Sequence, residues 1–144
     1  MLVAGDPPRG ALRQEVEALG MSAYVVFPGL VDDARRVLAA SDVGFVLSFR
    51  EAGSYAACES LSMGLPTLVS NAGGLPELVR DGVDGWIVPA GDVDVLHRWL
   101  LARLAAPVDA AMADAARDRA LALFSLPVLA RQTMDFYQRV RARA

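Results

Sequence analysis

Two carboxylates flank a predicted helix start in the middle of the chain. Glu51 and Glu59 are separated by seven residues within the stretch SFREAGSYAACES. Ser54 is a favourable N-cap, and residues 55–57 would then carry the first helical amides, which lack intrahelical partners. Such amides, at the positive end of the helix dipole, suit a phosphate group. An ionised carboxylate only accepts hydrogen bonds, so it suits sugar hydroxyls. The spacing predicts an anion site at the helix start with one carboxylate on each side.

Short apolar runs alternate with helical patterns on both sides of this segment. The runs predict strands over residues 2–4, 25–27, 43–47, 67–69 and 86–88. The periodic segments predict helices over residues 12–19, 32–40, 54–63, 76–80, 93–104, 109–123 and 126–143. Such alternation produces parallel strands joined by right-handed crossovers. The predicted fold class is therefore α/β, a Rossmann-like, doubly wound parallel sheet.

The positions of the loops follow from this fold class. Ligands of doubly wound sheets bind beyond the carboxyl ends of the strands. We therefore expect the functional edge to carry the loops at residues 5–9, 28–31, 48–55 and 70–75. The strand over residues 43–47 is apolar throughout, which predicts that both of its faces are covered.

Composition excludes several classes of function. Hydrophobic residues make up 54% and charged residues 22% of the 144 residues, a globular balance with no sign of disorder. The net charge of −3 does not favour nucleic-acid binding. Cys58 is the single cysteine, and we find neither a signal-peptide pattern nor an apolar run of membrane-spanning length. We therefore expect a cytoplasmic protein without an internal disulfide.

Four segments resemble, in order, a known family. They are LVAGDPP, VVFPGLVDD, AASDVGFVLSFRE and ESLSMGLPTLVSNAGGLPELVRDGVDGWIVPAGD. Together they are similar to the donor-binding, C-terminal domain of retaining glycosyltransferases of group 1, which have the GT-B fold. The seven-residue spacing of Glu51 and Glu59 matches that family's paired-glutamate motif. The resemblance covers nearly the whole chain, so we expect residues 1–144 to form one nucleotide-sugar-binding domain.

The resemblance implies a role for each matching residue. Glu51 would touch the donor sugar near its reacting carbon, and Glu59 would bind the ribose hydroxyls. The amides of Ser54 and Tyr55 would hold the diphosphate, next to Gly53, where many family members have an aromatic residue. Two other turns would shape the base pocket. One begins at Gly5 and runs to residue 7, and the other is formed by Pro28, Gly29 and Leu30.

Two features in and just after the loop at residues 70–75 stay open at this stage. Gly73 and Gly74 either let a ligand approach the backbone or make a tight turn. Glu77 either interacts with the dipole of a short helix or contacts a ligand. We include both glycines among the expected donor-binding residues.

The family's domain begins with a strand and helix that carry a basic diphosphate-binding pair, whereas Met1 follows that unit. In the strand order 3-2-1-4-5-6 the first strand is central. The sequence therefore predicts a gap in pairing between the strands at residues 2–4 and 43–47. It also implies that an N-terminal acceptor domain or a partner chain completes the enzyme.

Two further predictions concern the final helix. We expect a buried stripe on the segment 126–143, formed by Leu129, Thr133, Phe136 and Val140, that packs on this domain or toward the acceptor domain. The arginines of its last turns predict a solvated helix end, with a peripheral contact to anionic lipid as the alternative; they are Arg139, Arg141 and Arg143.

The predicted function is transfer of a sugar, with retention, from a nucleoside diphosphate sugar to a saccharide or lipid-linked acceptor, as in polysaccharide biosynthesis. The resemblance implies no metal and no other cofactor. Whether the chain is an enzyme by itself stays open, and the alternative is a non-catalytic remnant or binding module of the same fold. A related sugar-nucleotide epimerase would lack the paired glutamates.

Overall fold

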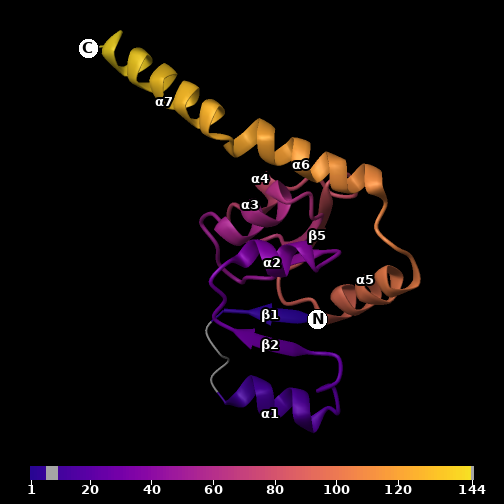
Figure 1. The fold of residues 1–144 in the computed structure, drawn as a ribbon. Helices are drawn as coiled ribbons and strands as arrows, with labels where there is room; N and C mark the ends of the chain where they lie inside the picture. The colour runs from indigo at the N-terminus through magenta and orange to yellow at the C-terminus, as the bar shows by residue number, and fades with distance from the viewer. Residues whose placement is uncertain (6–9, 144) are drawn as a thin grey trace. The chain divides into compact units, whose positions relative to one another are not determined.

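Every strand pair in the described chain is parallel, as the alternation of strands and helices predicts. The computed structural model describes residues 1–5 and 10–143 (Figure 1). These residues divide into two units, Met1–Ser41 and Asp42–Ala144. Each unit contains parallel strands with flanking helices, so the α/β, Rossmann-like fold class is confirmed.

The described part of the first unit alternates strands and helices in the order β1 (Leu2–Ala4), α1 (Ala11–Ala18), β2 (Val26–Gly29) and α2 (Ala34–Ala39). Strands β1 and β2 pair in parallel, with Leu2 opposite Val26. Asp33 is the N-cap of helix α2, and its carboxylate accepts a hydrogen bond from the Arg35 amide at 3.0 Å.

The second unit contains β3 (Gly44–Val46), α3 (Tyr55–Ser62), β4 (Thr67–Ser70), α4 (Leu75–Leu78), β5 (Gly85–Val88), α5 (Val93–Ala105), α6 (Ala110–Phe124) and α7 (Leu126–Arg141). Its strands lie in the order β3-β4-β5. All four residues of the central strand β4 are buried, because it has a neighbour on each edge and helices on its faces.

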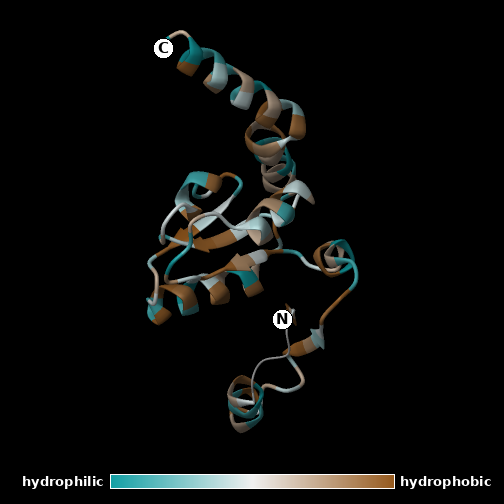
Figure 2. Ribbon diagram, turned by 90° about the vertical axis from the view of Figure 1, so that its left-hand side faces the viewer, coloured by the Kyte–Doolittle hydropathy of each residue, from teal (hydrophilic) through white to brown (hydrophobic). Residues whose placement is uncertain are grey.

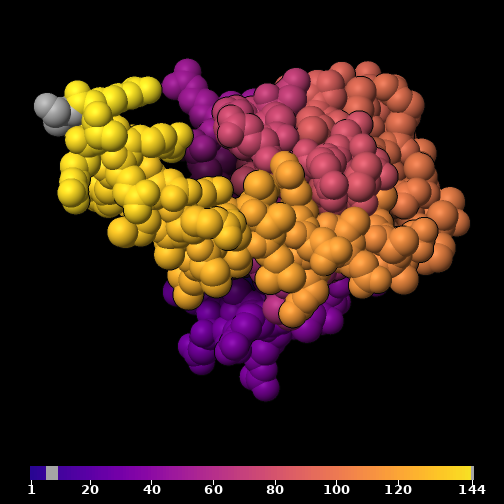
Figure 3. Space-filling model, turned by 90° about the horizontal axis from the view of Figure 1, so that it is seen from above, coloured from indigo at the N-terminus to yellow at the C-terminus, as the bar shows by residue number. Residues whose placement is uncertain are grey.

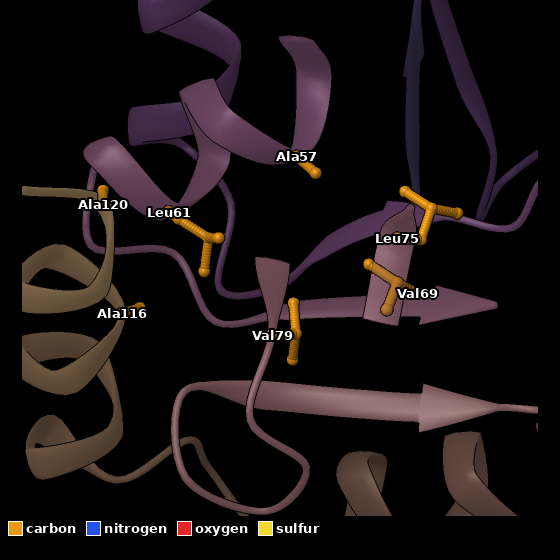
Figure 4. Close-up of a cluster of buried hydrophobic side chains, with 7 residues drawn as sticks. All are labelled: Ala57, Leu61, Val69, Leu75, Val79, Ala116 and Ala120. Atoms are coloured by element: carbon orange, nitrogen blue, oxygen red, sulfur yellow. The ribbon is translucent and has the colours of Figure 1, made fainter. Parts of the chain in front are cut away.

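The core of the second unit lies between β4 and the helices α3, α4 and α6. Figure 4 shows the buried apolar side chains that meet there, which are Ala57, Leu61, Val69, Leu75, Val79, Ala116 and Ala120. The hydropathy colouring of Figure 2 follows this arrangement, because the strands are largely apolar while the helices are apolar on part of their surface. Buried alanines allow α6 to approach α3 closely, and Figure 3 shows α6 (orange) beside the α3–α4 segment (pink).

An aromatic cluster occupies the opposite face of the β3-β4-β5 sheet. Phe45, Leu68 and Trp86 are aligned across the three strands. The Trp99 ring of α5 packs edge-on against Phe45 and Trp86, with ring centroids 5.8 and 5.0 Å apart. This geometry is one that aromatic pairs favour.

The predicted gap in strand pairing falls between the two units and stays a prediction. Within the first unit β1 pairs with β2, and within the second unit β3 pairs with β4. The prediction that the strand at residues 43–47 is covered on both faces is wrong, because Phe45 is 41% exposed and Leu47 is 40% exposed. An apolar run favours burial, but β3 is an edge strand of the described β3-β4-β5 sheet. Its side chains therefore have fewer neighbours to cover them.

The stripe predicted on the last helix does not pack on this domain in the described chain, and its packing toward an acceptor domain stays a prediction. Helix α7 has no buried residue, and Leu129, Thr133, Phe136 and Val140 are all exposed. The stripe exists in the sequence, but no described element covers it. Over the described residues, no helix is long and apolar enough to cross a membrane.

Two neighbours on the face of the sheet that carries the aromatic cluster provide a matched test of burial there. Leu68 is fully buried on β4, and Phe45 lies beside it on β3. We expect Leu68→Ala to lower the free energy of unfolding by about 2–5 kcal/mol, because it leaves a cavity. Phe45→Ala should cost less than about 2 kcal/mol, since its ring is partly solvated. Urea denaturation measures both, and equal losses would contradict the assigned burial.

Candidate functional site

Helix α3 begins with the cap that the sequence predicts. Ser54 has extended backbone angles and is 7% exposed, and its hydroxyl accepts a hydrogen bond from the Ala57 amide at 3.2 Å. The expectation that the amides of residues 55–57 are all free is therefore wrong for Ala57, because the cap uses that amide. Within the described chain, the Tyr55 and Ala56 amides have no hydrogen-bond partner.

The start of α3 is open to solvent. Gly53 and Ala56 are exposed, and Tyr55 is 87% exposed. Glu51 is half-buried in the loop before the helix, and Glu59, the fifth residue of α3, is exposed. Free amides at the positive end of a helix dipole can bind a phosphate, and a carboxylate lies nearby in sequence on each side; donor binding at this helix start stays a prediction.

Two hydrogen bonds hold the loop between β3 and α3. The buried Ser70 hydroxyl at the end of β4 donates to the Ser48 carbonyl at 2.5 Å. Farther along, the Gly74 amide donates to the Glu51 carbonyl at 3.2 Å. The loop is thus fixed to the carboxyl end of the neighbouring strand and to the turn that follows it.

Gly73 and Gly74 form a tight turn, one of the two arrangements that the sequence left open. Gly73 has a φ of +55°, and a Cβ at this position would collide with the Glu51 carbonyl. A Cβ on Gly74 would lie 2.6 Å from the Ala52 carbonyl oxygen. The pair therefore forms a tight turn that packs directly against the backbone of the Glu51 loop. Contact of these glycines with a donor stays a prediction.

A second turn supports the same loop. The Phe49 ring lies over Gly91, whose φ is +78°, and a Cβ there would lie 2.9 Å from Phe49 Cε1. The Asn71 side-chain oxygen accepts from the Ala90 amide at 2.9 Å and ties this turn to the end of β4. Sequence analysis missed Ser70, Asn71 and Gly91; the glycine in the PAGD turn was the available signal.

One titratable group next to the site is shifted. The pKa of the Cys58 thiol is raised, mainly because burial disfavours the thiolate and also because Glu59 is negatively charged. The thiol is therefore protonated near neutral pH and is a poor nucleophile. Over residues 1–5 and 10–143, no three metal-binding side chains gather into a cluster.

The expected base-binding residues lie in the first unit. The Gly5 amide donates to the Gly29 carbonyl at 2.9 Å, which brings the two predicted turns together. Both glycines have positive φ, Pro28 lies in β2, and Leu30 is 77% exposed. Residues 6 and 7 of the first turn lie outside the described residues. A base contact for these turns stays a prediction.

Substitution of Gly73 tests the support of the Glu51 loop. We expect Gly73→Ala to lower the free energy of unfolding by about 1–3 kcal/mol, because it adds strain at positive φ and a collision with the Glu51 carbonyl. Gly53→Ala is the matched control, since no atom lies within 4 Å of its added Cβ and its φ is not positive. Thermal unfolding compares the two variants, and an unchanged Gly73→Ala melting curve would contradict this packing.

Residues 1–105 match the family described as "Glycosyl transferases group 1". The chain is 34% identical over 146 residues to the MMP alpha-(1->4)-mannosyltransferase of Mycolicibacterium hassiacum, covering 99% of this chain and 36% of that protein. It is 37% identical over 103 residues to the D-inositol 3-phosphate glycosyltransferase of Mycobacterium marinum, covering 65% of this chain and 22% of that protein. The chain thus spans about a third or less of the length of these curated relatives.

The fold is similar to that of solved structures. A crystal structure of Anabaena Alr3699/HepE in complex with UDP superposes with a TM-score of 0.85 at 25% identity, covering 96% of this chain and 40% of that one. Sucrose-phosphate synthase from Thermosynechococcus elongatus superposes with a TM-score of 0.82 at 28% identity, covering 99% of this chain and 39% of that one.

Proposed function

Because the chain belongs to the glycosyl transferases of group 1, we propose that its second unit binds the diphosphate and sugar of a nucleoside diphosphate sugar. The observation that carries this proposal is the solvent-open start of α3, where the Tyr55 and Ala56 amides lack partners. UDP in the similar HepE structure supports the choice of ligand class.

The free amides give the site its chemistry. When the bond between sugar and diphosphate breaks, negative charge grows on the leaving diphosphate. Fixed amides and the dipole of α3 stabilise that charge without reorganisation, which is commonly the largest contribution to catalysis. Tyr55 is the first residue of α3, so its amide lies at the end of the dipole where this effect is greatest.

In this proposal the two carboxylates bind different parts of the donor. Glu51 lies in the loop held by Gly74, where a carboxylate accepts hydrogen bonds from the hydroxyls of the reacting sugar. Glu59 lies farther along α3 and accepts from the ribose hydroxyls. Transfer proceeds with retention, as in the enzymes that the motif resembles, to a saccharide or lipid-linked acceptor.

Acceptor binding requires more than the described residues in this proposal. The chain spans 36% of the mannosyltransferase that it resembles. The exposed apolar residues of α7, including Leu129, Phe136 and Val140, form a surface for an acceptor domain or a partner chain. Burial of exposed apolar area of this kind stabilises association.

Nucleotide titration tests the proposal. We expect UDP, GDP or ADP to bind the purified chain, and Glu59→Ala to weaken that binding about tenfold or more, because hydrogen bonds to a charged group are lost. Isothermal titration calorimetry measures the affinity. Glu17→Ala, which removes an exposed glutamate from α1, is the control and should bind as the wild type does.

The results of this titration separate a donor-binding domain from a non-catalytic module. Equal affinity of the Glu59→Ala and wild-type chains would contradict the ribose contact. Absence of binding by all three nucleotides would contradict the donor site and favour a non-catalytic module with the same fold.

A further inference from the structure

Two arginines of α6 bind the carboxyl ends of two different helices. Arg117 Nη1 donates to the Ser62 carbonyl, the last residue of α3, at 3.1 Å. Arg119 Nε donates to the Leu78 carbonyl of α4 at 3.2 Å, and its Nη2 donates to the Glu77 carbonyl at 2.7 Å. Cations at the carboxyl end of a helix satisfy its free carbonyls and oppose its dipole.

The base from which Arg119 reaches α4 is rigid. Its neighbour Ala120 is 3% exposed and Ala116 is fully buried, and both belong to the core between α6 and α3. Arg119 itself is half-buried. The guanidinium therefore starts from a helix that core packing already fixes, so it can fix a second element.

Helix α4 needs such an external support. It has four residues, and its N-cap, Gly74, has no side chain to make a capping bond. A helix this short has almost no intrahelical hydrogen bonds, so its stability comes from tertiary contacts. These contacts are the buried Leu75 and Val79 side chains and the two hydrogen bonds from Arg119.

The opposite end of α4 supports the candidate site. The Gly74 amide donates to the Glu51 carbonyl at 3.2 Å, and the Gly73–Gly74 backbone packs against the Glu51–Ala52 backbone. A continuous set of contacts thus runs from Arg119 through α4 and Gly74 to Glu51. Arg117 contacts α3 and has no hydrogen bond to α4 in the described chain.

We propose that Arg119 is a positioning residue for Glu51, acting through α4 and Gly74. The assignment of Glu51 to the donor sugar rests on the proposed function, whereas the contacts from Arg119 to the Glu51 loop do not. Loss of Arg119 lets α4 shift, weakens the Gly74 bond and misplaces the carboxylate that accepts from the sugar. The Tyr55 and Ala56 amides, which belong to α3, keep their positions.

This division predicts a selective effect on ligand binding. UDP contacts the start of α3, so Arg119→Ala should bind UDP within about twofold of the wild type. UDP-glucose adds the sugar that Glu51 contacts, and its affinity advantage over UDP should fall about fivefold or more, the loss expected for hydrogen bonds to a charged group. A general loss of stability would change both affinities together.

The first experiment measures backbone hydrogen exchange by NMR on the 144-residue chain. Arg119→Ala should speed exchange of the Gly74 amide about tenfold, because its bond to Glu51 opens more often. Arg117→Ala is the matched control and should leave Gly74 within about twofold of the wild type. Arg119→Lys keeps the charge but has a single donor nitrogen. The Gly74 exchange rate in this variant should therefore lie between the rates in Arg119→Ala and Arg117→Ala. Unchanged Gly74 exchange in Arg119→Ala would overturn the proposal.

The second experiment measures UDP and UDP-glucose affinities of the same variants by calorimetry. A reduced UDP-glucose advantage in Arg119→Ala alone supports the positioning role. Faster Gly74 exchange with an unchanged advantage overturns it and leaves Arg119 a purely structural residue. If Arg119→Ala does not fold, Arg119→Lys carries both tests. If the wild type binds none of the three nucleotides UDP, GDP and ADP, the proposed function fails, and the exchange result still decides whether Arg119 holds the Glu51 loop.

Discussion

The close approach of two backbone segments determines where Glu51 lies. The Gly73–Gly74 turn packs against Glu51 and Ala52 so tightly that any side chain on either glycine would collide with a carbonyl group. One hydrogen bond, from the Gly74 amide to the Glu51 carbonyl, closes this contact. A loop that must present a carboxylate gains a fixed backbone in this way, and the strain of positive φ is borne by glycine, which adopts it at little cost.

The rest of the second unit builds outward from that contact. The buried strand β4 supplies Ser70, which holds the loop at Ser48, and leads directly into the glycine turn. The core between α3 and α6 fixes the helix whose first amides stay unpaired. The first amides of α3 thus stay unpaired while the segments around them are fixed. Electrostatic stabilisation requires this arrangement, because the donors must not move as charge develops.

Local patterns made much of this fold predictable. Strand and helix positions and the Ser54 cap follow from periodicity and capping chemistry. Contacts between distant segments were not predictable: Arg119 and Glu77 are 42 residues apart, and no pattern links them. Exposure of Phe45 was also missed, and the partner of the α7 stripe stays open, because amphipathicity shows which face needs a partner but not where that partner is.

The central claim is that the open start of α3 receives the diphosphate of a nucleotide. The most direct measurement is an NMR titration of the chain with UDP that follows each backbone amide. We expect the largest shifts at Tyr55 and Ala56, with little change at the starts of α5 and α6, because their N-caps Asp92 and Asp109 carry negative charge that disfavours an anion, whereas the N-cap Ser54 of α3 is neutral. Saturable binding that leaves Tyr55 and Ala56 unshifted would contradict the claim.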